Sequence, residues 1–363
     1  MARLVFYHHP QAENFSLKYS SASVTEIQSQ REQSDESTKL IGYPFETPVY
    51  VLYEGDSEIE SAQDIDFDQE WLSDRIRDLP RAGQVVAFRL VELLEAAVDV
   101  RDEDEFRLYK EFEPQKIQQA LDHVSWGAPL PTVAGEVMSN LILRHSLPNA
   151  NHRTGIAMLQ FCIESVNPDF AMPPTHVDDD TWREWVDPYI VDSKRLITVR
   201  RNNLRFKQLK NLEVDLVERK DGIQIRLAEF ELDMHWREAL SKYAKQHESH
   251  CTDFAQAVLE RAERDDLLDR QGPTKQEFIT YLEDGLVERD FKEMFRSVAK
   301  LGDRLTDLTD VFTPLKVKFF SEVVNRLFEA HTGKESVKRD KSSADICCSA
   351  VSVEILFFRD TIV

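Results

Sequence analysis

The stretch Thr132–Val166 decides the fold, and it reads TVAGEVMSNLILRHSLPNANHRTGIAMLQFCIESV. Apolar residues recur every four positions from Val133 to Leu141, and the next step of four reaches His145. This spacing puts one face of a helix in the core and leaves a histidine at its C-terminal end. A second apolar stripe begins at Ile156 and repeats at helical spacing. The stretch therefore predicts two helices joined by a short polar loop.

The loop holds side chains that suit a phosphate group. His145 titrates near neutral pH and can accept a proton from a hydroxyl group. Arg153 offers a planar donor fork for phosphate oxygens, and the free N–H groups of a first helical turn attract anions. With the amides of Asn149 and Asn151, these groups predict phosphoryl or nucleotidyl transfer. The alternative interpretation is a polar loop whose residues serve turn formation alone.

The loop resembles the active-site motif of the Fic/Doc family, H-x-F-x-(D/E)-G-N-(G/K)-R-x-x-R. His145, Asn151 and Arg153 occupy fixed positions of that motif. Leu147 takes the aromatic position, and Ala150 takes the first glycine, as in Doc-type members. The resemblance therefore rests on three fixed residues and on a replacement that the family also shows.

The order of predicted elements before the loop is also similar to that of the family. A flap would span residues 101–112, a short helix 114–124, and the helix into the site 132–144. The resemblance covers roughly residues 70–200 and implies a helical core with a small β-hairpin flap. The flap would bind an extended segment of a target protein by pairing main chain to main chain.

The resemblance implies a role for each residue of the loop. His145 would be the general base on a Ser, Thr or Tyr hydroxyl of a protein, with ATP or another nucleoside triphosphate as the donor. Asn151 would orient the phosphates, Arg153 would bind them, and Mg²⁺ would sit near Asn149. The backbone N–H groups from Ala150 onward would form an anion hole. The implied phosphate-binding set is Asn149, Ala150, Asn151, His152 and Arg153.

Two positions depart from the family's pattern. Asn149 replaces the acidic residue that usually holds Mg²⁺, and a neutral amide is a weaker ligand for a hard cation. Ile156 replaces the second arginine, which grips the terminal phosphate in AMP-transferring members and which Doc-like phosphotransferases also lack. The sequence therefore favours the Doc-like variant of the motif over the AMP-transferring one. The alternative is a catalytically impaired nucleotide-binding or regulatory interaction module, with a relation to toxin–antitoxin systems as a further one.

We expect a mainly α-helical protein in four parts. Residues 1–69 would form an N-terminal arm with a short strand, and residues 70–200 the Fic/Doc-like domain. Residues 201–331 would form a mixed, mostly helical C-terminal domain, and residues 332–363 a tail. A hairpin is predicted near residues 214–227, because Asp-Gly between apolar residues is a strong turn signal.

The composition of the 363-residue chain limits the class of partner. A formal net charge of −21 opposes binding to nucleic acid, whose affinity for proteins comes mainly from neutralised phosphates. No apolar run approaches the roughly 18 residues that a membrane helix needs, so no membrane partner is expected. The four cysteines form no C-x-x-C pair, and no secretory signal is evident, so we expect a reducing, cytoplasmic location.

Three further segments allow both a functional and a structural interpretation. Ser20–Lys39 is polar and would be a loose arm. His247–Cys251 has histidines at a metal-like spacing, but its polar character favours a solvated helix surface. Arg200–Arg205 is a basic patch in an acidic chain, and it would be either an ordinary helix face or a docking site for an acidic protein or a nucleotide.

Overall fold

The described part of the chain is mainly α-helical, as predicted, and it carries two small sheets. The structure is a computed structural model, and it describes residues 2–34, 37–55, 74–99, 112–147, 151–173, 181–219 and 222–286. The chain forms two compact units, residues 1–63 with 188–250 and residues 64–187 with 251–362. The divisions between them fall inside α8 (Thr181–Asn211) and α9 (Trp236–Arg261).

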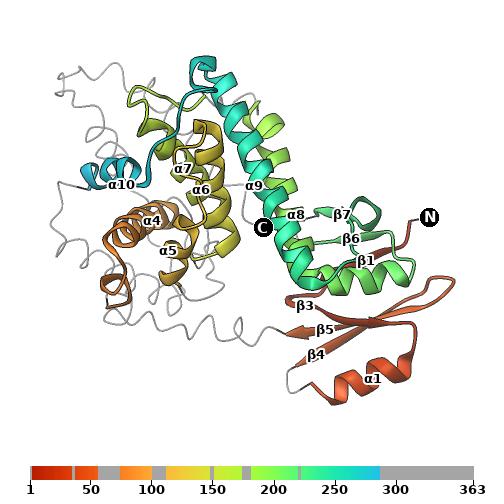
Figure 1. Ribbon diagram of the computed structural model, residues 1–363. Helices are drawn as coiled ribbons and strands as arrows, with labels where there is room; N and C mark the ends of the chain where they lie inside the picture. Colours follow the sequence, from red (N-terminus) through yellow and green to blue (C-terminus); the bar gives the residue numbers. More distant parts are fainter. Residues whose placement is uncertain are drawn as a thin grey trace, which may run out of the picture. The chain divides into compact units, whose positions relative to one another are not determined.

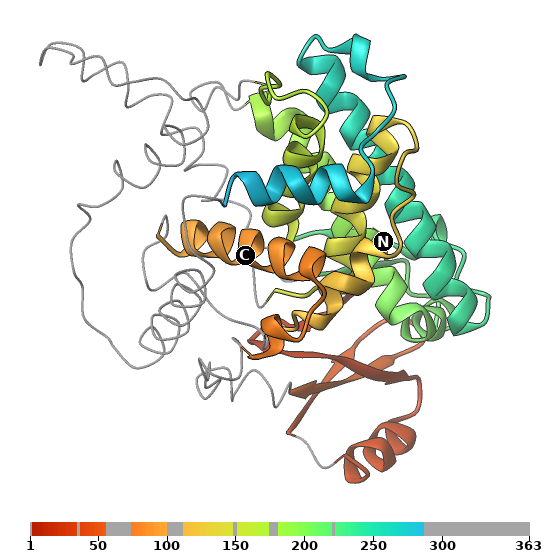
Figure 2. The same cartoon turned by 60° about the vertical axis from the view of Figure 1, so that its left-hand side comes forward.

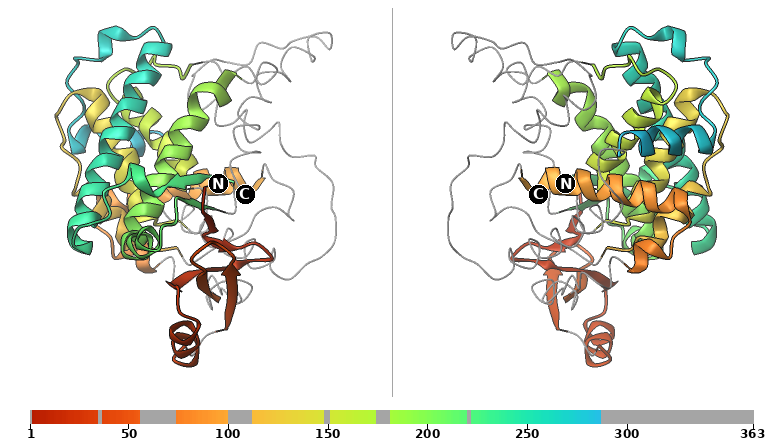
Figure 3. Two further views of the ribbon diagram at one scale, coloured as in Figure 1. Left: turned by 90° about the vertical axis from the view of Figure 1, so that its right-hand side faces the viewer. Right: turned by 90° about the vertical axis from the view of Figure 1, so that its left-hand side faces the viewer.

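The first unit contains both sheets (Figure 1). The larger sheet is antiparallel with the strand order β2-β3-β5-β4, and α1 packs beside β3 and β5 (Figure 3). The smaller sheet has the order β1-β6-β7, in which β1 runs parallel to β6. The elements are β1 (Leu4–Phe6), β2 (His8–His9), β3 (Ala12–Ser21), α1 (Val24–Glu32), β4 (Thr38–Tyr43), β5 (Val49–Gly55), β6 (Leu216–Glu218), β7 (Gln224–Arg226) and the 3-10 turn η4 (Leu227–Glu229).

The core of the first unit joins the sheets to the helices α8 and α9. Val51 of β5 and Val217 of β6 are fully buried in one cluster with Phe206 of α8 and Tyr243 of α9. The alternation of apolar residues along the strands places every second side chain in this core. The predicted hairpin is confirmed, because β6 and β7 pair antiparallel and Gly222 adopts a φ of 72° in the turn between them.

The prediction of a loose arm over Ser20–Lys39 is wrong. Its middle part folds as α1, whose N-cap Ser23 accepts a hydrogen bond from the N–H of Glu26 at 3.4 Å. The helix buries only Ile27, so it carries no amphipathic pattern for the sequence to reveal. The short strand expected within residues 1–69 is confirmed as β5, although it is one of five described strands in that segment and not the only one.

The second unit is a helical assembly around α6 and α7, and α10 lies beside α4 (Figure 2). Gly155 of α7 lets the helices approach closely, because a Cβ there would lie 2.9 Å from Cγ1 and Cδ1 of Ile142. The helix predicted over residues 132–144 begins earlier than expected: α6 starts at Leu130, and Pro131 occupies the first turn, where a missing N–H is tolerated. The elements are α4 (Arg81–Asp99), α5 (Gln115–Leu121), α6 (Leu130–Arg144), α7 (Asn151–Glu164), η5 (Asp265–Leu267) and α10 (Lys275–Asp284).

Several predicted features lie outside the described residues. They are most of the flap at residues 101–112, of which only Phe112 is described and is buried, and the whole tail at residues 332–363. The helical prediction beyond Leu286 falls there too.

Candidate functional site

The predicted helix–loop–helix is confirmed as the junction of α6 and α7, with His145 at the helix end. His145 is the C-cap of α6, and its backbone adopts the left-handed conformation, with φ 53° and ψ 53°. Its N–H donates to the carbonyl groups of Leu141 and Ile142, both at 3.1 Å. A left-handed residue with a Cβ is strained by about 1 kcal/mol or more, and such strain gathers at functional sites. The half-buried His145 thus marks the point where the chain leaves α6.

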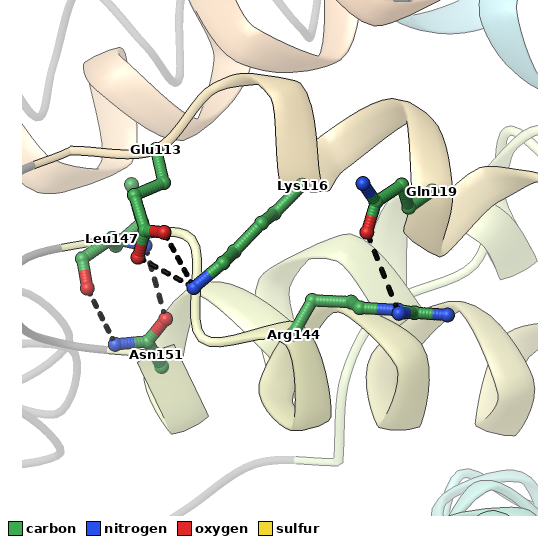
Figure 4. Close-up of polar contacts among 6 residues, drawn as sticks. All are labelled: Glu113, Lys116, Gln119, Arg144, Leu147 and Asn151. Atoms are coloured by element: carbon green, nitrogen blue, oxygen red, sulfur yellow. Dashed lines mark hydrogen bonds and ion pairs between the residues drawn. The ribbon is translucent and has the colours of Figure 1, made fainter.

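Asn151 ties the two ends of the loop together (Figure 4). Its side-chain oxygen accepts a hydrogen bond from the N–H of Leu147 at 3.2 Å, and its side-chain nitrogen donates to the carbonyl of Leu147 at 3.0 Å. Leu147 is 1% exposed and Asn151 is 8% exposed, so the pair fixes the loop in a buried setting. The amide is therefore engaged with the backbone, and its role here is to hold the loop's shape.

The first turn of α7 brings together the groups that can attract an anion. Arg153 lies in this turn and is buried, while His152 is half-buried. The hydroxyl of Thr154 donates to the carbonyl of Asn151 at 3.2 Å and reinforces the turn. The first N–H groups of a helix lack acceptors within the helix, and the helix dipole is positive at this end. The turn is thus suited to a phosphate group.

A charged pair on the approach to α5 also contacts the loop, and the sequence alone did not single it out. The N–H of Glu113 donates to the carbonyl of Ser146 at 2.9 Å. The carboxylate of Glu113 pairs with the ammonium of Lys116 at 2.6 Å, and both side chains face the loop near Asn151 (Figure 4). The sequence could have indicated this pair, because Glu113 and Lys116 are three residues apart at the start of a predicted helix.

Arg144 is a third cation beside the loop, in addition to Arg153 and Lys116. It lies one residue before His145. Its guanidinium donates to the side-chain oxygen of Gln119 on α5 at 3.4 Å (Figure 4). It also approaches the ring of His123 at 3.1 Å. Arg144 thereby links the end of α6 to α5.

Two of the predicted site residues, Asn149 and Ala150, lie outside the described part of the chain. Within that part, no group of three or more His, Cys, Asp or Glu side chains is arranged to hold a metal ion. Glu113, whose backbone N–H contacts the described loop, has its carboxylate already paired with Lys116. The described donors therefore do not make a ligand set that fits Mg²⁺.

The prediction that His247–Cys251 is a solvated helix surface is wrong. His247 is fully buried, and its Nε2 shares a 2.7 Å hydrogen bond with the hydroxyl of Ser193 on α8. Nε2 of His250 contacts the carbonyl of Tyr189 at 2.8 Å. The two histidines join α9 to α8 and do not converge on one metal position. Burial is the main cause that lowers the pKa of His247, to about 3, with His250 and Arg200 as further causes.

The chain belongs to a family of unknown function, DUF8172, whose model matches residues 1–286. No curated protein matches the chain. No solved structure matches it either. None of the described helices is both long enough and apolar enough to cross a membrane.

Proposed function

We propose that the α6–α7 junction is the active site of a Fic/Doc-like helical core. It would transfer a phosphoryl or nucleotidyl group from ATP, or another nucleoside triphosphate, to a protein hydroxyl. The observation that carries the proposal is the placement of His145 and Arg153 at the two ends of one loop that Asn151 holds closed. A proton acceptor and a cationic helix N-terminus are the two features that this reaction needs.

In the proposed reaction, the imidazole of His145 accepts the proton of a Ser, Thr or Tyr hydroxyl as the hydroxyl oxygen bonds to phosphorus. The bond from phosphorus to the leaving group breaks, which releases ADP in phosphoryl transfer and pyrophosphate in AMP transfer. Arg153 and the N–H groups of the first turn of α7 stabilise the charge on the phosphoryl oxygens. Any Mg²⁺ would be held mainly by the phosphates themselves.

The proposal favours phosphoryl transfer over AMP transfer. Ile156 stands where AMP-transferring members of the family have an arginine, and its side chain is buried in the packing of α7. The side chain of Ile156 has no charge with which to bind the terminal phosphate, as the arginine of those members does. The protein target would dock on residues 101–112.

A regulatory module that binds a nucleotide without turnover is the second candidate. Two features of the loop favour it: Asn149 has no negative charge for a metal ion, and the amide of Asn151 is occupied by Leu147. Such a module would keep the anion-binding turn at Arg153 and lose the chemistry at His145.

The test uses the purified full chain with Mg²⁺ and ATP that is labelled separately at the α and γ phosphates, in a cell lysate that supplies targets. The expected result is protein-bound label from the γ phosphate, which His145→Ala abolishes. His235→Ala is the matched control, because His235 is an exposed histidine just before α9 in the other unit.

The outcomes separate the two candidates. Label from the α phosphate alone would mean AMP transfer. Another group would then have to bind the terminal phosphate, because Ile156 replaces the arginine that does so in the family. Label that survives His145→Ala would contradict the assigned base. Bound ATP without transfer of label would support the regulatory module.

A further inference from the structure

In the first unit, the helices α8 and α9 lie side by side and run in opposite directions (Figure 1). Three side-chain contacts join them: the hydroxyl of Ser193 with Nε2 of His247 at 2.7 Å, Nε of Arg200 with the carbonyl of Leu240 at 3.1 Å, and the ammonium of Lys207 with the carboxylate of Asp233, just before α9, at 2.5 Å. Each contact lies seven residues later on α8 and seven residues earlier toward the start of α9 than the one before it. Because seven residues make about two helical turns, the contacts define one antiparallel register.

The kink in α8 leaves this register intact. Asn202 has φ −120° and ψ 20°, so the backbone is not helical there. One contact with α9 precedes the kink and another follows it, and both fit the same seven-residue step. Leu204 lies three residues before Lys207, and Trp236 lies three residues after Asp233. The register therefore brings Leu204 opposite Trp236.

Both of these apolar side chains are exposed to solvent. Leu204 is 57% exposed and Trp236 is 44% exposed, and they are two of the four large apolar residues that are exposed in the described part of the chain. Ala239 and Tyr243, three and seven residues after Trp236, are buried in the core of the unit. The seam between the helices is thus closed at Tyr243 and open at Leu204 and Trp236, which we call the open seam. A single exposed apolar residue is ordinary, whereas two at one level of a seam form a patch.

The two segments that form the open seam are rich in basic residues. Arg200–Lys210 of α8, which includes the basic patch singled out in the sequence, has five basic residues and no acidic one. In the facing segment 233–240, the guanidinium of Arg237 lies over the ring of Trp236, 5.1 Å from its centroid. The acidic residues of that segment are Asp233, which pairs with Lys207, and Glu238. Basic residues therefore outnumber acidic ones by six to two here, in a chain with a net charge of −21.

We propose that the open seam binds an acidic amphipathic helix of a partner protein. The apolar face of that helix would cover Leu204 and Trp236, as an amphipathic helix does in a groove between two helices. Its carboxylates would contact the basic residues of the two segments, including Arg237. Trp and Arg are the residue types most enriched among those that dominate binding at protein interfaces. The surface lies in the first unit, so the proposal does not depend on the activity proposed for the α6–α7 loop.

A protein helix fits the open seam better than nucleic acid does. Nucleic acid carries a charge at each phosphate, and the net charge of −21 opposes it along its length. A short acidic helix interacts mainly with charges within a Debye length, about 8 Å at physiological ionic strength, and basic residues predominate in the segments around the seam. The exposed side chains of Leu204 and Trp236 also require an apolar surface on the partner, which a phosphate backbone does not offer.

The test is the fluorescence anisotropy of a labelled model helix, built from Glu, Ala and Leu with Leu on one face, upon titration with the full-length protein. We expect saturable binding that Leu204→Ser and Trp236→Ser each weaken by about tenfold or more, because each removes an apolar contact. Val24→Ser is the matched control, since Val24 is a 39% exposed apolar residue of α1 in the same unit. Arg237→Gln should weaken binding and lower its salt dependence, whereas Arg226→Gln, at an exposed arginine of β7, should do neither. Circular dichroism melts of each variant show that the fold is kept.

A matched model helix in which Lys replaces every Glu tests the role of charge, and it should bind at least about tenfold more weakly. Equal binding of the two helices, absence of saturable binding, or binding that both Leu204→Ser and Trp236→Ser retain would overturn the proposal. Labelled oligothymidylate and phosphatidylserine vesicles are titrated in parallel. Binding of either that is tighter than that of the acidic helix and is lost in Trp236→Ser would also overturn it, and would assign the open seam to nucleic acid or to a membrane surface.

Discussion

At the scale of the residue, the loop between α6 and α7 depends on His145 and Asn151. His145 adopts a left-handed conformation at the end of α6, and Asn151 satisfies both backbone groups of Leu147 in a buried position. The sequence predicted His145 at the helix end from the four-residue spacing of its apolar face. It could not predict where the Asn151 side chain binds, because an asparagine before a helix suits a ligand contact and a loop contact equally well.

Asn151→Ala should destabilise the fold. The change removes two hydrogen bonds and leaves the N–H and the carbonyl of the buried Leu147 without partners. We expect the free energy of unfolding to fall by about 1–3 kcal/mol. Urea denaturation measures the change, and Asn211→Ala, at the exposed end of α8, serves as the control. Equal midpoints for the two variants would show that the Leu147 contact does not stabilise the loop.

His247 should make the stability of the protein fall in mild acid. The pKa of His247 is lowered to about 3 in the fold, against about 6.5 in an unfolded chain. Between these values the unfolded state binds more protons, so stability is lost as the pH falls below about 6.5, by about 1.4 kcal/mol per pH unit. His247→Asn should remove this part of the loss.

The measurement is the free energy of unfolding at pH 7 and pH 5 for both proteins. Wild type should lose about 2 kcal/mol more than His247→Asn over this interval. An equal loss would mean that His247 becomes protonated within the folded protein.

At the scale of the element, periodic apolar patterns predicted the helices and turn chemistry predicted the hairpin. Segments rich in polar residues gave less information about helices and burial. α1 buries one residue, Ile27, so its helical period is invisible in the sequence. The burial of His247 could have been found, because Cys251, Phe254 and Val258 continue the same helix face at steps of four, three and four. The polar residues around His247 hide this apolar face, because histidine itself does not count as apolar.

The packing of α6 against α9 within the second unit should not tolerate a side chain at Gly135. A Cβ there would lie 2.5 Å from the backbone nitrogen and 2.6 Å from the Cα of Thr252, and backbone atoms cannot turn away. Gly135→Ala should therefore lower the free energy of unfolding by about 1–3 kcal/mol, as overpacking does.

Gly83→Ala in α4 is the matched control. The new Cβ would meet only side-chain atoms, the closest being Cβ of Leu79 at 3.2 Å, and alanine favours a helix by about 1 kcal/mol over glycine. Thermal melts should show a large drop for Gly135→Ala and little change or a gain for Gly83→Ala. Similar melting temperatures for the two variants would contradict the close contact of α6 with Thr252.

At the scale of the whole molecule, the chain combines one candidate phosphate site, the α6–α7 loop, with a large negative charge. The α6–α7 loop lies in the unit formed by residues 64–187 and 251–362. It places Arg153 in the first turn of α7, in a chain with 66 acidic and 45 basic residues. A net negative charge opposes binding of polyanions such as nucleic acid, so we expect the proposed site to take a small or singly attached phosphate.

The most direct measurement is hydrogen exchange across the full chain, with and without ATP and Mg²⁺, followed by mass spectrometry. It needs no substitution, so a loss of folding cannot imitate a loss of binding. The account predicts that ATP slows exchange in residues 145–156, where the first-turn N–H groups of α7 would bind phosphate. Unchanged exchange in that segment at saturating ATP would contradict the proposal that the α6–α7 loop handles nucleotide phosphates.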